Sequence, residues 1–81
     1  MATVVLNVPY VRQWMDQQGW SERQMAQQMG IAYSYVNRLL TGQRNVGPHA
    51  IAGLAIIGID WHLALRVVIE ESPSTHYPSD V

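Results

Sequence analysis

Apolar residues recur at helical spacing along most of this chain, and a glycine or a proline separates each run from the next. The two central runs are Met25, Ala26 and Met29, followed by Val36, Leu39 and Leu40. Gly30 lies between them, where an abrupt turn requires a positive φ that glycine adopts without strain. The pattern predicts two short helices joined by a tight turn. Helices this short are stable only when they pack against flanking helices.

Capping residues indicate the limits of this helix pair. An S-x-x-Q capping box at Ser21 starts the first helix at about Glu22. Gly42 stops the second helix, which is expected over about 33–40. The helix-turn-helix as a whole is therefore expected over about residues 22–40.

Prolines mark the starts of two flanking helices. Pro9 suits the first turn of a helix over about 9–18, and Pro48 opens another over about 48–57. The apolar stripe expected on the second of these flanking helices is Ile51, Leu54 and Ala55. We expect this stripe to face the core.

The two ends of the chain are less regular. Residues 1–8 contain the stretch TVVLNV, which is typical of an extended arm or a strand. Asp60 is a good N-cap for a fifth helix over about 61–71. The run VVI within that range is also strand-like, and as a strand it would pair with the N-terminal stretch. Residues 72–81 hold two prolines and no periodicity, so we expect a flexible tail.

Three residues of the motif have a defined size or shape: Ala26 is small, Gly30 forms the turn and Val36 is branched. The apolar positions around them are Met25, Met29, Ile31 and Leu39. In this respect the sequence resembles the Cro/phage-repressor type of helix-turn-helix, the xenobiotic-response-element (XRE) family of DNA-binding regulators. The resemblance covers about residues 8–68. It implies a compact, all-α, five-helix lambda-repressor-like domain over residues 9–71, and it favours a helix rather than a strand after Asp60.

Three positions depart from the family pattern. Glu22 stands where the family often has a glutamine that reaches a phosphate, and a phosphate would repel this carboxylate. Ala32 stands where a serine or threonine often caps the second helix, at a loss of about 1 kcal/mol. Met15 and Leu40 stand where many members carry a buried Arg–Glu pair. An apolar pair replaces a buried ion pair at little or no cost, so the fold is expected to survive.

The charge is unevenly distributed along the chain. The net charge of −1 alone argues against binding to nucleic acid. Residues 1–59, however, hold four arginines against two carboxylates, a net +2, whereas residues 60–81 hold one arginine against four carboxylates, a net −3. Because local charge matters more than the total at a docking face, the first part of the chain remains compatible with DNA.

The second helix of such a motif enters the major groove, with its N-terminal part against base edges. The helix wheel and the resemblance predict base contacts from Tyr33, Ser34, Asn37 and Arg38. Phosphate contacts are expected from Ser21, Arg23, Tyr35, Gln43, Arg44 and Asn45. Taken singly, any of these side chains is more often an ordinary surface or capping residue. The hypothesis depends on their sharing one face.

Other function classes find little support. The chain has no cysteine, no signal-peptide pattern and no apolar run long enough to span a bilayer. His49, His62 and His76 lie at no metal-ligand spacing. No nucleophile has a base at a recognisable spacing, so we expect no enzyme, and no cofactor or small-molecule ligand is indicated.

We therefore interpret the chain as a small homodimeric transcriptional regulator of the repressor type that binds a palindromic operator in double-stranded DNA in the cytoplasm. The dimer interface is predicted on one face of the fifth helix, from Trp61, Leu65, Val68 and Ile69. The alternative is a protein-interaction module of the same fold, such as an antitoxin or a partner of another regulator. Salt-sensitive binding to DNA would support the regulator, whereas recovery of a protein partner would support the interaction module.

Overall fold

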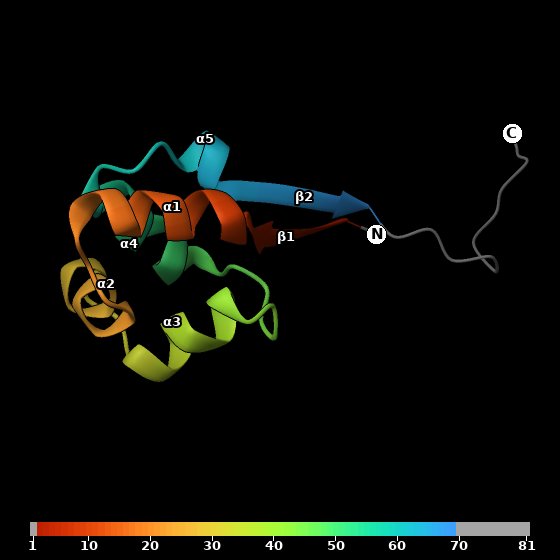
Figure 1. Cartoon of the computed structure of the whole chain (residues 1–81). Helices are drawn as coiled ribbons and strands as arrows, with labels where there is room; N and C mark the ends of the chain where they lie inside the picture. The colour runs from red at the N-terminus through yellow and green to blue at the C-terminus, as the bar shows by residue number, and fades with distance from the viewer. Residues whose placement is uncertain (1, 70–81) are drawn as a thin grey trace, which may run out of the picture.

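The computed structural model describes residues 2–69, which form five helices and a small two-stranded sheet (Figure 1). In chain order the elements are β1 (Ala2–Leu6), α1 (Val8–Gln18), α2 (Glu22–Met29), α3 (Tyr33–Leu40), α4 (Pro48–Ile57), α5 (Trp61–Ala64) and β2 (Leu65–Ile69). The expected five-helix, lambda-repressor-like architecture is confirmed. The tail predicted over residues 72–81 lies outside the described residues, as do residues 70 and 71.

The helix-turn-helix has the limits that its capping residues predict. The hydroxyl oxygen of Ser21 accepts from the Gln24 N–H at 3.2 Å, and the Ser21 N–H donates to the Gln24 side chain at 2.8 Å, which completes the capping box. Gly30 ends α2 with φ +73°, a conformation that residues with a side chain rarely adopt. Ala32 precedes α3 without a side-chain cap, as the sequence indicates.

The fifth helix is much shorter than expected. It comprises the single turn α5, in which the Asp60 carboxylate accepts from the His62 N–H at 3.1 Å. The chain then extends into β2, which pairs antiparallel with β1 in a register that runs from Leu6 opposite Leu65 to Ala2 opposite Ile69. The predicted helix over 61–71 is therefore wrong over residues 65–69, and the strand that its VVI run also suggested is the structure observed there. The β-branched residues of both segments fit a pleated ladder, in which each strand satisfies the other's backbone groups.

The core takes buried side chains from β1, from all five helices and from the loops that follow α3 and α4. Its buried apolar side chains are Leu6, Val11, Met15, Met25, Ala26, Met29, Val36, Leu39, Leu40, Val46, Ala50, Leu54, Ile59 and Ala64. Met15 and Leu40 are both among them, so apolar side chains do occupy the two positions at which the family often carries an ion pair. Trp14 and Trp20 extend the packing at one end of α1, with their rings edge to face at a centroid distance of 5.3 Å.

Helix α4 presents a different face to the core from the one predicted. Ala50, Gly53 and Leu54 are buried, whereas Ile51 and Ala55 are exposed. The reason lies at Gly53, where a Cβ would stand 2.9 Å from the Cβ of Met29 and 3.1 Å from its carbonyl oxygen. The absence of a side chain allows α2 to approach the backbone of α4, and this contact rotates the buried stripe toward the glycine.

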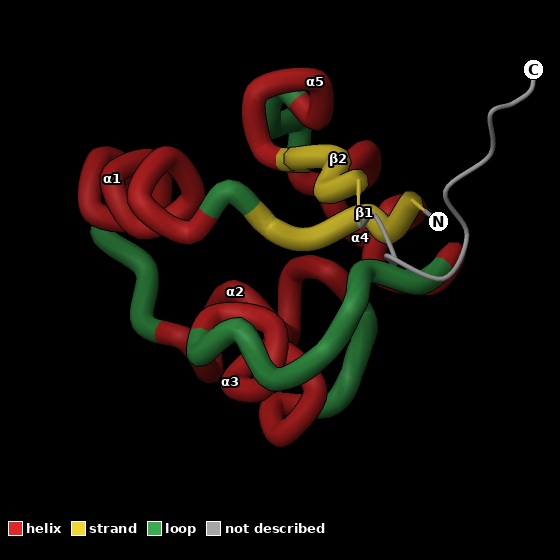
Figure 2. Tube along the Cα trace, turned by 90° about the vertical axis from the view of Figure 1, so that its right-hand side faces the viewer, coloured by secondary structure: helices red, strands yellow, loops and turns green. Residues whose placement is uncertain are grey.

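Helices α2 and α3 lie together on the side of the molecule away from α5 and the sheet, as the two perpendicular views agree (Figures 1 and 2). The segment that follows α3 returns to the sheet, where the Val46 N–H donates to the carbonyl oxygen of Val4 at 2.8 Å. The outer side of α3 is therefore left uncovered by the rest of the described chain.

We predict that Gly53→Ala destabilises the fold by about 1–3 kcal/mol, although alanine is the better helix former by about 1 kcal/mol. The added methyl group must displace Met29 atoms that are already in contact distance. Thermal and denaturant unfolding of the two proteins measures the difference. As a control, His49→Ala on the exposed side of the same helix should be neutral or slightly stabilising. Undiminished stability of Gly53→Ala would show that α2 and α4 are not in such close contact.

Candidate nucleic-acid interface

Helix α3 has one buried side and one open side. Val36, Leu39 and Leu40 are buried in the core. Of the four residues predicted to contact bases, Tyr33, Ser34 and Arg38 are exposed and Asn37 is half-buried. The open side of the helix is thus polar and carries a cation, and its orientation is fixed by three core side chains on the other side.

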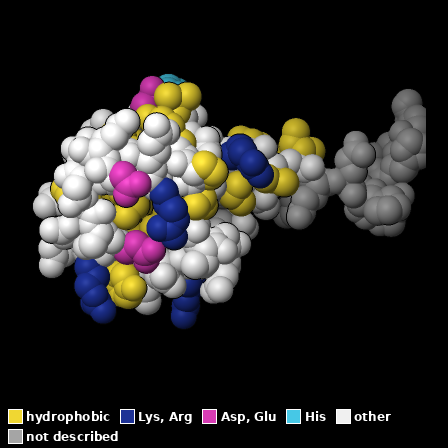
Figure 3. All heavy atoms as spheres, viewed as in Figure 1, with side chains coloured by type: hydrophobic (Ala, Val, Ile, Leu, Met, Phe, Trp, Pro, Cys, Tyr) yellow, Lys and Arg dark blue, Asp and Glu magenta, His cyan; other side chains and the backbone are white. Residues whose placement is uncertain are grey.

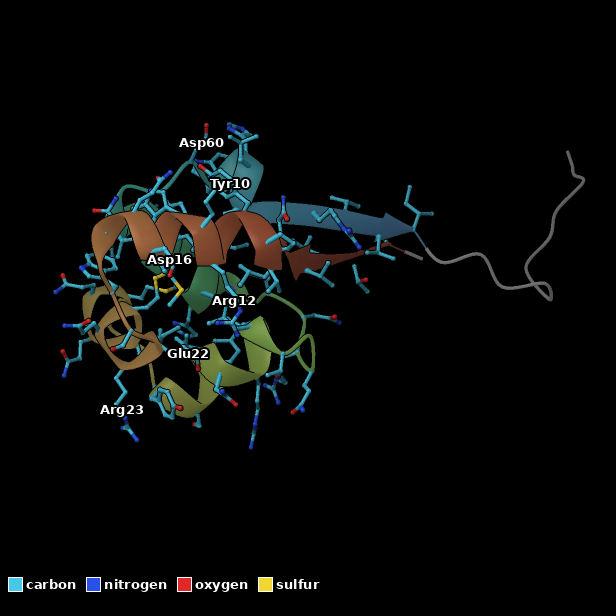
Figure 4. The ribbon with its side chains drawn as sticks, viewed as in Figure 1. Tyr10, Arg12, Asp16, Glu22, Arg23 and Asp60 are labelled. Atoms are coloured by element: carbon cyan, nitrogen blue, oxygen red, sulfur yellow. The ribbon has the colours of Figure 1, made fainter. Side chains whose placement is uncertain are left out.

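Arg23 and Tyr33 connect the open sides of α2 and α3. The guanidinium carbon of Arg23 lies 4.3 Å from the centre of the Tyr33 ring, in a cation–π contact typically worth about 0.5–1 kcal/mol at an exposed site. Figure 4 shows Arg23 projecting away from the body at the edge of the helix pair. A predicted phosphate contact and a predicted base contact therefore belong to one continuous surface.

The N-terminus of α2 lies beside this surface. Ser21 caps the helix, and its hydroxyl oxygen accepts from the Gln24 N–H, while within residues 2–69 its own O–H donates to no acceptor and can serve as a donor. The capping role and the predicted phosphate contact therefore do not exclude each other. The helix dipole makes this end favourable for an anion.

Glu22, the first residue of α2, bridges three helices. Arg12 of α1 donates to one of its carboxylate oxygens at 3.3 Å, and the side-chain amide of Asn37 on α3 donates to the other at 3.0 Å. Figure 4 shows Arg12 and Glu22 next to each other between α1 and α2. The carboxylate is therefore balanced by a cation, so the repulsion of phosphate expected at this position is reduced. Sequence reasoning missed Arg12, because its partner lies on a different helix and no spacing rule relates them.

The loop after α3 carries the remaining predicted phosphate contacts, Gln43, Arg44 and Asn45, all of which are exposed. Its start is held by the Gln43 N–H, which donates to the carbonyl oxygen of Arg38 at 2.8 Å. Near its end, the Gly47 N–H donates to the hydroxyl of Tyr35 at 3.1 Å. The guanidinium carbon of Arg44 lies 5.8 Å from the Tyr35 ring centre. Tyr35 therefore holds the loop against α3, and within the described residues its hydroxyl hydrogen donates to no protein acceptor.

The residues predicted to form the dimer interface do not share a helical face. Leu65 and Ile69 alternate with Val68 along β2, so Val68 faces the opposite side of the sheet. Leu65 packs against the core, and Trp61 stacks on His62 with ring centroids 3.8 Å apart. The most exposed of the four is Ile69, and the equally apolar Val67 beside it was not predicted. The shared face is wrong, whereas dimerisation itself stays a prediction.

In the space-filling view, basic side chains project at the lower edge of the molecule, where Figure 1 places α2 and α3, and others lie beside the acidic side chains in the middle of this face and over the strands (Figure 3). Within residues 2–69, no three histidine, aspartate or glutamate side chains gather as a metal site. No helix in this part of the chain is long and apolar enough to cross a membrane.

Comparison with protein families decides how this geometry is classified. The model of the helix-turn-helix family HTH_3 matches residues 11–56, more than half of the chain. The chain belongs to this family. HTH_3 domains are of the Cro/C1, XRE type, so the resemblance inferred from the motif is confirmed. The comparison with curated proteins and the comparison with solved structures gave no match.

The HTH_3 match places the candidate interface within a DNA-binding, non-catalytic domain, in agreement with the expectation that the chain is not an enzyme. The matched region begins inside α1 and ends inside α4. It includes α2, α3 and the loop after them, and therefore every residue predicted to contact DNA. Both strands and α5 lie outside it.

We predict that Tyr35→Phe lowers the free energy of unfolding by about 1 kcal/mol, because the Gly47 N–H loses its partner. Chemical denaturation measures the loss. Tyr33→Phe is the matched control, since within the described residues the Tyr33 hydroxyl makes no hydrogen bond. Equal stability of the two variants would mean that Tyr35 does not hold the loop.

Proposed function

We propose that this protein is a sequence-specific transcriptional regulator, a small homodimeric repressor whose helix α3 enters the major groove of operator DNA. The observation that carries the proposal is the division of α3 into a side fixed in the core and an uncovered side that bears Tyr33, Ser34 and Arg38. A major groove admits one α-helix, and a helix held rigidly on one side presents its other side in a defined register.

The contacts divide into base readout and positioning. Arg38 is suited to the two acceptors of guanine, and Asn37 to adenine, while Tyr33 and Ser34 lie near the start of α3, where base edges are closest. Phosphate contacts on either side are proposed to fix the register: Ser21 and Arg23 at the start of α2, Tyr35 in the first turn of α3, and Gln43, Arg44 and Asn45 in the loop after α3.

The modest charge bears on how such a protein reaches useful affinity. Residues 2–69 carry five arginines against three carboxylates, a net charge of +2. Few phosphate contacts give weak non-specific binding, so selective binding rests on base contacts and on the use of two copies. Two recognition helices about 34 Å apart would read two successive major grooves of a palindromic operator. Occupation of such a site blocks polymerase, and this is the sense in which we propose a repressor.

The sheet is the proposed dimer interface. In the described structure β2 pairs only with β1, so its other edge is free, while β1 receives the Val46 N–H on its own outer side. Val67 and Ile69 on β2 are 62% and 74% exposed. A free strand edge with exposed β-branched side chains is a ready site for a second copy, and it lies away from α3.

One observation favours the alternative function. Ile56 on α4, with Trp61 and Leu63 on α5, are exposed apolar residues outside the proposed DNA face. Such residues suit contact with a protein partner, as in an antitoxin or a partner of another regulator. Salt-sensitive binding to DNA upstream of the protein's own gene supports the regulator, whereas recovery of a stoichiometric partner without DNA binding supports the interaction module.

We predict that Arg38→Ala weakens binding to a selected operator by about 1–3 kcal/mol and relaxes the preference at one base pair, because Arg38 reads a base edge. Arg44→Ala should weaken binding to all sequences about equally and reduce the slope of log affinity against log salt by about one, because Arg44 contacts a phosphate. Competition binding over a range of salt concentrations separates the two effects.

The two arginine variants serve as controls for each other, since both lose one positive charge on the same face. If Arg38→Ala keeps the wild-type sequence preference, the recognition-face assignment is refuted. A sequence-selective loss in Arg44→Ala at an unchanged salt slope would instead assign base readout to the loop.

We predict that Ile69→Asp converts the dimer to a folded monomer that binds a palindromic operator much more weakly, because it places a charge on the exposed face of β2. Ile56→Asp is the matched control, since Ile56 is 72% exposed, close to the 74% of Ile69, but lies on α4. Analytical ultracentrifugation at micromolar concentration measures the state of each protein. A wild-type monomer that binds a palindromic site tightly as one copy would refute the proposed interface.

A further inference from the structure

Asn37 is unlike the other residues predicted to read bases, because its side chain already has a protein partner. Tyr33, Ser34 and Arg38 are exposed, whereas Asn37 is half-buried and donates from its amide nitrogen to Glu22 at 3.0 Å. The bond spans 15 positions in sequence and joins the first turn of α2 to the middle of α3. An exposed side chain without a protein partner adopts its orientation only when it binds DNA. The Asn37 side chain is already oriented in the free protein by its bond to Glu22.

The identity of the partner determines which way the amide faces. An ionised carboxylate only accepts hydrogen bonds, so the amide nitrogen of Asn37, and not its oxygen, must face Glu22. The reversed orientation would set the amide oxygen against the carboxylate. A glutamine at position 22 would impose no such choice, since its amide both donates and accepts.

Arg12 holds the carboxylate in place for this role. Its guanidinium donates to the second oxygen of Glu22 at 3.3 Å, so the two oxygens serve two different helices. The side chains of Arg12 and Glu22 are 47% and 23% exposed, so the network borders the surface on which α3 presents its other polar residues. The arginine also balances the charge that the carboxylate would otherwise turn toward DNA.

We propose that Glu22 is a specificity-determining positioning residue, which orients the amide of Asn37 so that its oxygen is the group offered to a base. Within the major groove, adenine and cytosine present an amino donor, whereas guanine and thymine present a carbonyl acceptor at the corresponding place. The oriented oxygen selects an amino base over a keto base. The second amide hydrogen stays available for the adenine N7, which favours adenine of the two. This inference rests on the proposed function, because it concerns how the same face reads DNA.

The test compares base preference at every position of a selected operator for the wild type and the variants Glu22→Ala, Asn37→Ala and Asp16→Ala. The wild type should prefer an amino base about tenfold at the position where Asn37→Ala loses its preference. Glu22→Ala should lose most of that preference at the same position, while its binding to unrelated DNA is unchanged or tighter. Asp16→Ala removes an equal charge from exposed α1, without a bond to Asn37, and should keep the preference.

Loss of selectivity without loss of general affinity is a result that structural damage does not produce, since damage lowers both. The double variant Glu22→Ala/Asn37→Ala should be no less selective than Asn37→Ala alone, because both changes remove the same contact. In the free protein, the side-chain amide resonance of Asn37 in ¹H–¹⁵N spectra should shift in Glu22→Ala and stay in place in Asp16→Ala.

The outcomes also separate this inference from the proposed function. A wild-type protein that selects an operator and depends on Arg38, but whose amino-base preference survives in Glu22→Ala, refutes the positioning role and leaves the function standing. Additive losses in the double variant refute it as well. A wild-type protein that selects no DNA sequence at all refutes both proposals.

Discussion

The close approach of α2 to α4 is the contact on which the arrangement of the molecule depends. Met29 packs against the backbone of α4 at Gly53, where any side chain would collide with it. This contact places α2, and α2 places α3 through the turn at Gly30. The orientation of the proposed DNA-binding face therefore depends on a missing side chain on α4, a helix that carries none of the residues proposed to contact DNA.

The helix-turn-helix was predictable from sequence because its determinants are local. The capping box at Ser21, the positive φ at Gly30 and the 3.6-residue spacing of the buried side chains all act within a few residues of each other. The errors lie where the determinant is distant. A fifth helix was expected because Asp60 is a good cap, and it does cap one turn. What ends that turn is pairing with β1, at the other end of the described chain, which no local pattern contains.

The same distinction holds for the candidate site. The set of residues on the open side of α3 follows from a helix wheel, and all of them lie within the region that matches the HTH_3 family. Their partners do not follow from it. The hydrogen bonds of Tyr35 with Gly47, and of Glu22 with Arg12 and Asn37, connect separate elements. They could not be predicted from sequence, because they depend on how those elements pack. The buried face of α4 was predicted wrongly for a different reason. A helix wheel ranks positions by their apolar side chains, so it gives no weight to Gly53, which is buried because its lack of a side chain lets α2 pack closely.

The pairing of β1 with β2 has a consequence for the order in which the chain folds. Its register joins Ala2 to Ile69, so the sheet closes a loop that contains every helix described. Closing so long a loop costs more chain entropy than forming any turn between neighbouring helices, and contacts of this separation form late. The helices are thus able to assemble first and the strands to join them afterwards. A second copy that docks on β2 would then stabilise the last-formed and first-lost part of the fold, so that association and completion of the tertiary structure become a single cooperative, concentration-dependent event.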